Sequence, residues 1–423
     1  MKANYTLQDN PLVDGIKIIG IGKHGSKPLP ESLLHKIAEY LKAEDYVVPI
    51  QKGAFYGALL AKGPTQMEQE LLLPSDGDVA AFDVRQLYDT LCADSPTEMR
   101  EIGVKLLQKE TLSEAEAEKL GHYIFSDFPG ETFRGMAASM MRIRYETDEE
   151  YLGLLNAVVA TYTPGFQEPI AIPETTIQLA EPFDGVEHSY MITPLLAKAL
   201  QEAGYRVVVT MGRSAGPKLA LNTLDLYKGL DSTLIQNTKE LKGDTPQFGW
   251  ALDQRALSPA LDKWVDRRRT IFKRPFLATL EKVLNPFQAD ILITSVFHIT
   301  YMQKMVTLAD MAGFRGVIVL KRGLEGTLAP SLAKASGILC AARQPDGAFV
   351  TETFEADDER FSSFRAEADD KVEPLQLEEN LQLIRQYAAQ GYTANEDFNK
   401  RVGLAVALFS TGLEWLQEKM HVR

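Results

Sequence analysis

One short segment carries the residue types needed to bind an anion. Residues 212–217 have the sequence Gly-Arg-Ser-Ala-Gly-Pro and follow an apolar run typical of a β-strand. The free N–H groups of this loop, beginning at Gly212, could converge on a phosphate with the Arg213 guanidinium and the Ser214 hydroxyl. Pro217 at a first-turn position would open a helix there. The alternative is an ordinary strand-to-helix turn that needs small residues.

A basic run is the second candidate. It contains one acid, Asp266, and six cations: Lys263, Arg267, Arg268, Arg269, Lys273 and Arg274. Such a run could contact the phosphates of a nucleic acid, or it could be the solvated face of a surface helix. A net charge of −13 and a pI near 5.1 oppose nucleic-acid binding by the molecule as a whole. The sequence also lacks an aromatic stacking platform.

Other chemistry is poorly supported. The two cysteines, Cys92 and Cys340, are far apart and have no metal-type or redox spacing, so neither a disulfide nor a metal site is expected. His298 follows a strand candidate, but a lone histidine is more often structural. No apolar run approaches the ~20 residues of a membrane helix, and the first residues lack a signal-peptide core. We therefore expect a cytoplasmic protein without membrane contact.

The N-terminal part is predicted to be helical and duplicated. Residues 59–65 (Leu-Leu-Ala-Lys-Gly-Pro-Thr) stand in register with residues 141–147 (Met-Arg-Ile-Arg-Tyr-Glu-Thr), about 82 positions later. Ser113 and Glu116 predict a capping box at a helix start in the second copy. Asn10-Pro11 is interpreted as a breaker in an N-terminal arm. The alternative to duplication is that any two amphipathic hairpins look alike.

The rest of the chain is predicted to be an α/β domain. Apolar strand candidates at 206–211, 290–296 and 316–320 alternate with helical stretches, which favours a mostly parallel sheet covered by helices. A hairpin is expected at 338–350, and helices after residue 377. The predicted domains are an extra helical module at 1–98, a helical domain at 99–165 and the α/β domain at 166–423.

An ordered set of motifs resembles the glycosyltransferase family 3 proteins, the group of anthranilate phosphoribosyltransferase. The matching segments are residues 112–117 (Leu-Ser-Glu-Ala-Glu-Ala), 141–150 (Met-Arg-Ile-Arg-Tyr-Glu-Thr-Asp-Glu-Glu), 193–197 (Thr-Pro-Leu-Leu-Ala), 284–287 (Leu-Asn-Pro-Phe) and 323–327 (Gly-Leu-Glu-Gly-Thr). Within the second, Tyr145 stands where the family usually has glycine. The resemblance covers about residues 15–420. It is greatest to a divergent branch of paralogues with degraded catalytic motifs, some described as nucleic-acid binders.

The resemblance implies site residues one by one. Ser189 and Thr193 match hydroxyls that contact phosphate, with helix capping and core packing as the alternative. Arg274 matches an arginine near the acceptor's carboxylate, and Glu325 lies in the matching Gly-rich turn. The family's Gly-Thr-Gly-Gly-Asp loop is replaced by residues 181–185 (Glu-Pro-Phe-Asp-Gly).

The family's two Mg²⁺ ions depend on an Asp-Glu pair. Leu328-Ala329 stands in its place, so no cofactor is certain. The resemblance also implies a homodimer formed through the helical domain. The extra copy could fill that surface and leave a monomer.

Three functions remain open. The first is a phosphoribosyltransferase-like protein that binds a small phosphorylated or nucleotide-like ligand in an interdomain cleft, with standard Mg²⁺–phosphoribosyl pyrophosphate chemistry not expected. The second is a non-enzymatic paralogue that binds nucleic acid. The third is a structural or regulatory protein whose helices bind a partner. Any activity would be a pentosyl transfer, and the sequence does not decide whether catalysis remains.

Overall fold

The chain forms two compact units. The computed structural model describes residues 5–22, 25–43, 46–73, 83–216, 218, 220–332, 336–365 and 372–420. The first unit comprises Met1–Thr161 with Lys263–Thr279, and the second comprises Tyr162–Asp262 with Leu280–Arg423. The predicted α/β domain at 166–423 included residues 263–279. They belong to the helical unit because Trp264 Nε1 donates to Ile124 O (3.1 Å) and Gln51 Nε2 donates to Thr270 O (3.0 Å).

The second unit contains a seven-stranded sheet in the order β3-β2-β1-β4-β5-β6-β7. The pairs from β3 to β5 are parallel, and β6 and β7 extend the sheet as an antiparallel hairpin. The predicted α/β fold class is therefore confirmed. The strands are β1 (Thr176–Ala180), β2 (Arg206–Met211), β3 (Trp250–Asp253), β4 (Ile291–Val296), β5 (Gly316–Lys321), β6 (Gly337–Arg343) and β7 (Phe349–Glu355).

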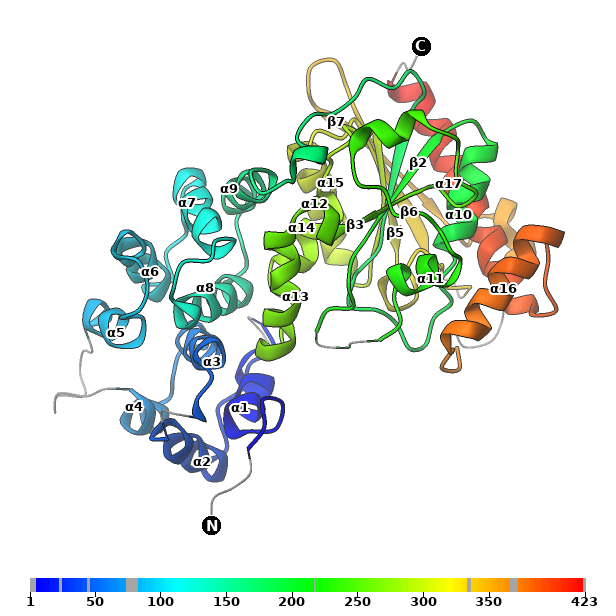
Figure 1. The fold of residues 1–423 in the computed structure, drawn as a ribbon. Helices are drawn as coiled ribbons and strands as arrows, with labels where there is room; N and C mark the ends of the chain where they lie inside the picture. The colour runs from blue at the N-terminus through cyan, green and yellow to red at the C-terminus, as the bar shows by residue number, and fades with distance from the viewer. Residues whose placement is uncertain are drawn as a thin grey trace. The chain divides into compact units, whose positions relative to one another are not determined.

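Helices cover both faces of this sheet (Figure 1). α10, α16 and α17 pack on one face through a continuous apolar core, and α14 and α15 lie on the other. The α-helices are α10 (Thr193–Glu202), α11 (Thr223–Gly229), α12 (Gln254–Leu257), α14 (Leu277–Val283), α15 (Met302–Met311), α16 (Leu377–Gln390) and α17 (Glu396–Met420).

The helix after β2 starts later than the sequence suggested. Asn222 caps α11, because its side chain accepts from the N–H of Asp225 and the Asp225 side chain bonds back to Asn222 N. The loop at 212–216 therefore does not open a helix directly. Pro217, which was predicted to do so, lies outside the described residues.

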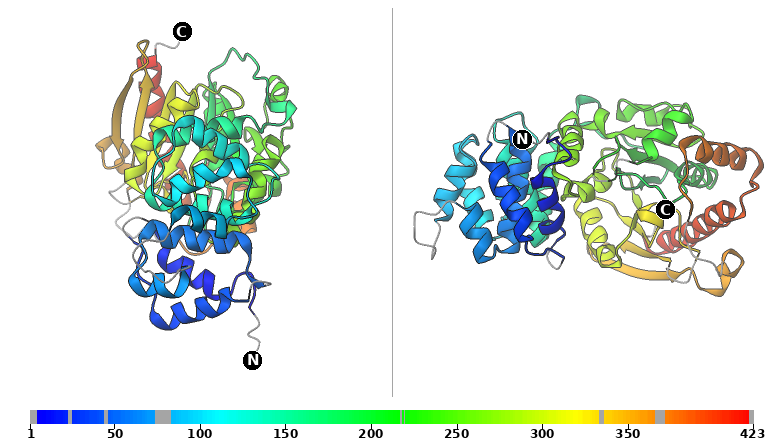
Figure 2. Two further views of the ribbon diagram at one scale, coloured as in Figure 1. Left: turned by 90° about the vertical axis from the view of Figure 1, so that its left-hand side faces the viewer. Right: turned by 90° about the horizontal axis from the view of Figure 1, so that it is seen from below.

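The first unit is helical. Figure 2 shows it from two further directions, with its residues before 161 in blue to green-cyan and residues 263–279 in yellow-green. Its α-helices are α1 (Pro11–Ile19), α2 (Glu31–Leu41), α3 (Pro49–Lys62), α4 (Gln66–Leu72), α5 (Val84–Leu91), α6 (Arg100–Leu107), α7 (Glu114–Ile124), α8 (Glu131–Arg144) and α9 (Asp148–Val159), and most of α13 (Pro259–Ile271) joins them. The interpretation of Asn10-Pro11 as a breaker is wrong. Asn10 caps α1 and Pro11 occupies its first turn, where a missing N–H costs nothing.

Helices α3 and α8 pack against each other through equivalent residues. Both have 14 residues, and they begin 82 positions apart. A Cβ added at Gly53 would lie 1.8 Å from Thr132 O, and one at Gly135, the equivalent position, 2.1 Å from Ile50 O, the equivalent of Thr132. Each helix thus contacts the other through the same pair of positions, as the two subunits do across a two-fold axis.

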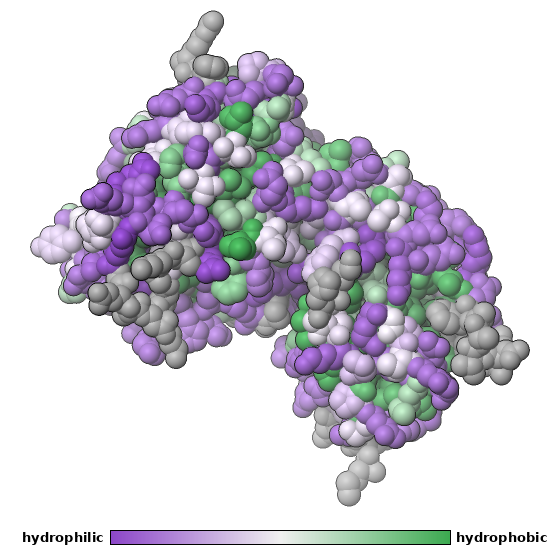
Figure 3. All heavy atoms as spheres, turned by 180° about the vertical axis from the view of Figure 1, so that it is seen from behind, coloured by the Kyte–Doolittle hydropathy of each residue, from purple (hydrophilic) through white to green (hydrophobic). Residues whose placement is uncertain are grey.

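The surface offers no large apolar area on the face drawn in Figure 3, where polar residues predominate and apolar ones form small separate groups. Among the described residues, no helix combines the length and apolar character needed to cross a bilayer.

Candidate functional site

The candidate site lies where the parallel strands of the second unit end. Strand β2 pairs with one side of β1, and β4 pairs with the other side. The direction in which successive strands are added to the sheet therefore reverses between β1 and β4. In open α/β sheets, ligands bind outside the carboxyl ends of the strands at such a switch point. The loops that follow β1, β2, β4 and β5 all reach this edge.

In the predicted anion loop after β2, the side chains of Arg213 and Ser214 donate to groups within the chain. Arg213 donates from Nε to Oδ1 of Asp262 (3.0 Å) and from Nη2 to Oδ2 (2.9 Å). Ser214 Oγ donates to Ala220 O (2.8 Å), and Gly212 O accepts from Asn222 Nδ2 (2.8 Å). The Arg213 guanidinium, which was predicted to bind a phosphate, is therefore bound by the carboxylate of Asp262. No local pattern could reveal Asp262, which lies 49 residues further along the chain.

A second carboxylate occupies the end of β1. Glu181 is almost fully buried, and its carboxylate accepts from Leu328 N (2.7 Å) and from Thr223 Oγ1 (2.8 Å). Burial raises the pKa of Glu181, while the Leu328 N–H and the hydroxyls of Thr193 and Thr223 act in the opposite sense. The chain thus places its own carboxyl group among donors that could otherwise hold an external anion.

A third carboxylate belongs to Glu325 in the turn after β5. It accepts from His188 N (2.6 Å) and Glu187 N (3.3 Å) and forms an ion pair with Lys218. Burial opposes ionisation, but the hydrogen bonds from Lys218 and from these backbone N–H groups hold the pKa of Glu325 below its ordinary value. Its backbone is left-handed (φ 52°), a conformation that a non-glycine residue adopts at a cost.

The two predicted hydroxyl residues are buried. Ser189 Oγ lies 3.1 Å from Thr327 Oγ1 and donates to Tyr190 O (2.9 Å), and Thr193 is the fully buried first residue of α10. Ser189 and Thr193 are thus both held in the interior of the second unit, and Thr193 does not cap α10, whose N-cap is Ile192. Within the described part of the chain, no group of three or more His, Cys, Asp or Glu could hold a metal ion. Leu328 and Ala329, at the place of the family's acidic pair, are fully buried apolar residues.

Four residues at the same edge were not singled out together from the sequence. Phe297 and Ile299, directly after β4, are 61% and 48% exposed, and the ring of His298 meets that of Phe297 edge-to-face at 5.0 Å. Arg322 follows the neighbouring strand β5, and its backbone N–H donates to Val296 O (3.1 Å). It is an exposed arginine with left-handed backbone (φ 56°). Large exposed apolar side chains beside a cation at a strand end are the signal that could have found this group.

The basic run belongs to the first unit and is largely neutralised there. Lys263 pairs with Asp127 (2.6 Å), and Arg267 donates two hydrogen bonds to Glu131 (3.0 and 2.7 Å). Arg268 is 1% exposed, and Lys273 is buried. Burial, followed by the charge of Arg142, lowers the pKa of Lys273 to about 7.

The remaining two cations of the run add little free charge. Arg269 is half-buried, Arg274 is exposed, and both interact with other groups of the chain. This arrangement offers much less free positive charge than the sequence suggested.

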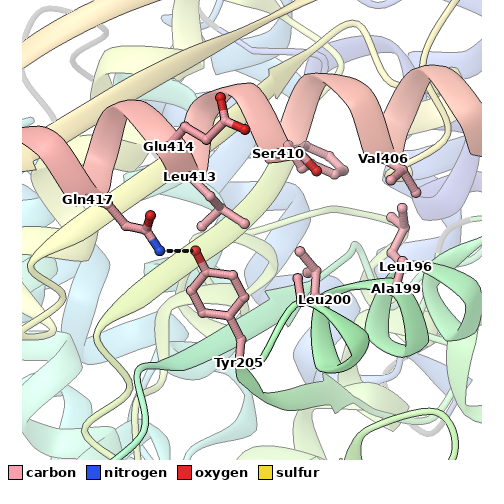
Figure 4. Close-up of a pocket in the computed structure, with 11 residues that line it drawn as sticks. Leu196, Ala199, Leu200, Tyr205, Val406, Ser410, Leu413, Glu414 and Gln417 are labelled. Atoms are coloured by element: carbon pink, nitrogen blue, oxygen red, sulfur yellow. Dashed lines mark hydrogen bonds between the residues drawn. The ribbon is translucent and has the colours of Figure 1, made fainter.

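A cavity of ≈ 240 Å³ lies away from this edge, between α10 and α17 (Figure 4). Leu196, Leu200 and Leu413 point into it, and at one end Gln417 Nε2 donates to Tyr205 Oη (2.6 Å). Its lining contains one carboxylate, from Glu414, and no cation. It is therefore unsuited to a phosphate.

Comparison with known proteins defines the fold. Anthranilate phosphoribosyltransferase from Thermus thermophilus has a TM-score of 0.52 and 19% identity, and the match covers 75% of this chain and 97% of that one. The enzyme from Saccharomyces cerevisiae in complex with PRPP and Mg gives a TM-score of 0.46 at 10% identity, covering 92% and 97%. The first likeness establishes a phosphoribosyltransferase-like α/β fold and nothing finer.

Sequence comparison adds one relative. An uncharacterized protein of Aquifex aeolicus (strain VF5) is 29% identical over 194 residues, which is 45% of this chain and 55% of the relative. The chain thus matches about half of that protein's length. No family model matches the sequence.

Proposed function

We propose that the α/β unit binds a phosphorylated, nucleotide-like ligand at the group formed by Phe297, His298, Ile299 and Arg322. The exposed Phe297–Ile299 surface beside Arg322 carries this proposal. An aromatic face can stack on a planar base, and a guanidinium can form two parallel hydrogen bonds to a phosphate. The position at the topological switch point and the fold of a phosphoribosyltransferase support it further.

The proposed ligand is held without the usual pair of metal ions. A hard dication requires carboxylate oxygens, and the positions of the acidic pair carry the buried Leu328 and Ala329. The carboxyl group of Glu181 also occupies the donors at the end of β1, the Leu328 N–H and the Thr223 hydroxyl. Phosphoribosyl transfer in the manner of the structural relatives would need that metal to offset the charge of the leaving pyrophosphate. The proposal is therefore one of ligand recognition.

Calorimetric titration of the full chain tests this function. The probes are nucleoside 5′-monophosphates and phosphoribosyl pyrophosphate, each with and without Mg²⁺. We expect a mononucleotide to bind independently of Mg²⁺. We expect Arg322→Gln to weaken binding at least tenfold, since a hydrogen bond to a charged group contributes roughly 1.5–3 kcal/mol. Phe297→Ala should weaken it by a similar factor through lost stacking.

A matched control is Arg360→Gln, which removes an exposed arginine of the same unit that pairs with Asp358. Its affinity should equal that of the wild type. Absence of binding at millimolar mononucleotide, or equal loss in Arg360→Gln and Arg322→Gln, would refute the proposal.

The nucleic-acid alternative has less support, because four of the six cations of the run are paired or buried. A titration with a short DNA duplex at low and moderate salt tests it directly. Steeply salt-dependent binding that is lost on charge reversal at Arg267, Arg268 and Arg269 would favour that function over the present proposal.

A further inference from the structure

The donors that hold Glu325 have the make-up of an anion site. Two consecutive backbone N–H groups, those of Glu187 and His188, point at one carboxylate, and the Lys218 ammonium adds a positive charge. Adjacent N–H groups that converge in this way form a concave nest that accepts a phosphate as readily as a carboxylate. In this conformation the Glu325 side chain fills the nest.

Two features distinguish Glu325 from the other internal carboxylates. Its side chain is 18% exposed and that of Lys218 is 29% exposed, whereas Glu181 is almost fully buried. Its backbone is left-handed at φ 52°, between Leu324 and a glycine that is also left-handed (Gly326, φ 85°). The carboxylate is therefore open to competition from solvent, and the turn that carries it has a strained backbone.

The nest and the proposed ligand site both lie in loops that follow strands at the carboxyl edge of the sheet. His188 and Glu187 lie in the loop that follows β1, and Glu325 lies three residues after Arg322 in the turn that follows β5. A ligand whose one phosphate contacts Arg322 would carry further phosphate oxygens into the same edge of the sheet. A monophosphate needs one such position and a pyrophosphate needs two.

The geometry points to a displaceable internal anion: Glu325 occupies a phosphate position formed by Glu187 N, His188 N and Lys218 Nζ, and a phosphate or pyrophosphate group takes its place on binding. No bond is made or broken, because one anion exchanges for another at the same donors. The inference rests on the proposed carboxyl-edge site, but it concerns a separate set of donors. It assigns pyrophosphate-bearing ligands to a site that Glu325 keeps closed.

The test compares pyrophosphate affinity in Mg²⁺-free buffer for the wild type, Glu325→Ala and Glu325→Ala/Lys218→Met, measured by calorimetry. We expect Glu325→Ala to bind inorganic pyrophosphate at least tenfold more tightly than the wild type. The double variant should lose this gain, because the nest then lacks its cation. Glu352→Ala removes an exposed carboxylate from β7 and is the matched control, with wild-type affinity expected.

Hydrogen exchange at the amides of Glu187 and His188 provides a second readout on the same proteins. Glu325→Ala should expose both amides to exchange, and pyrophosphate should protect them again. Weaker or unchanged binding in Glu325→Ala overturns the inference, as does a gain that survives Lys218→Met or appears equally in Glu352→Ala. Mononucleotide binding that depends on Arg322, together with a pyrophosphate affinity that Glu325→Ala leaves unchanged, would sink this inference and leave the proposed function standing.

Discussion

The two helical segments of the first unit have similar backbone conformations at equivalent positions, but one of these positions carries a residue type that its conformation disfavours. Thr65 caps α4 in a capping box with Glu68, and Thr147, 82 positions later, caps α9 in a capping box with Glu150. Glu68 also accepts from Leu29 N and pairs with Lys62, while Glu150 accepts from Leu112 N and pairs with Arg144. The same polar network thus joins two helices and a loop in each segment.

The segments differ at the turn before each capping box. Gly63 has φ 91° and ψ 111°, which costs glycine little. The equivalent Tyr145 has φ 69° and ψ 137°, and its side chain is 42% exposed. Both segments therefore keep the same turn, although the residue in the turn differs. Strain of this kind in a non-glycine residue is often found at functional positions.

The largest effect is expected from the buried carboxylates. Glu150→Ala should destabilise the protein by about 3–5 kcal/mol, because it leaves Arg144 and the Leu112 N–H without their partner. Glu68→Ala should cost a similar amount if the two networks are equivalent. Urea unfolding measures both. A cost near zero in one and not the other would show that only one segment needs the network.

A smaller effect is expected at the contact between α3 and α8. Gly53→Ala and Gly135→Ala should each destabilise by roughly 3 kcal/mol, because the added methyl group meets backbone atoms that cannot move alone. Gly15→Ala is the control, since the atoms nearest its methyl group would belong to the side chains of Phe55 and Ile37 and not to the backbone. Unfolding free energies that differ widely between Gly53→Ala and Gly135→Ala would break the equivalence of the two helices.

At the turn that contains Tyr145, we expect a substitution to increase the stability of the fold. Tyr145→Gly should stabilise the fold by about 1 kcal/mol, because it removes the cost of a positive φ in a non-glycine residue. Gly63→Ala should destabilise the other segment by a similar amount for the same reason. Thermal unfolding measures the change in stability of each variant relative to the wild type. A loss of stability in Tyr145→Gly would mean that the tyrosine side chain contributes more than its backbone costs.

The smallest effect is a dependence on pH. Burial raises the pKa of Glu68 and of Glu150, but hydrogen bonds from Lys62 or Arg144 and from backbone N–H groups outweigh it and leave both pKa values below 4.5. Each carboxylate therefore stabilises the fold fully above its unfolded value and less as pH falls through the folded value. The double variant Glu68→Gln/Glu150→Gln should show a flatter stability profile below pH 4.5. An unchanged acid slope would assign the dependence to other groups.

Local signals were predicted well from the sequence. The bounds of β2 agree with the predicted strand, and the capping box of Ser113 and Glu116 is present at α7. These features depend on residues a few positions apart. Strand β3 was missed, because its four residues are too few to establish an alternating or apolar pattern.

The candidate site was less predictable, because the residues that interact in it are far apart in the sequence. Arg213 was expected to face a ligand, but its partner Asp262 comes from the start of α13. Likewise, Glu181 meets Leu328 across 147 positions of sequence. Only the folded sheet brings such groups together. The donors could therefore be predicted from the sequence, but the carboxylates that accept from them could not.

The reciprocal packing of α3 and α8 has a consequence for how the first unit responds to dilution. When two copies of a module meet as separate chains, their association depends on protein concentration through mass action. Here both partners are tethered in one polypeptide, so their effective concentration is set by the linking chain and stays constant at any dilution. The contact through Gly53 and Gly135 can therefore persist in a cell that holds only a few copies of the protein.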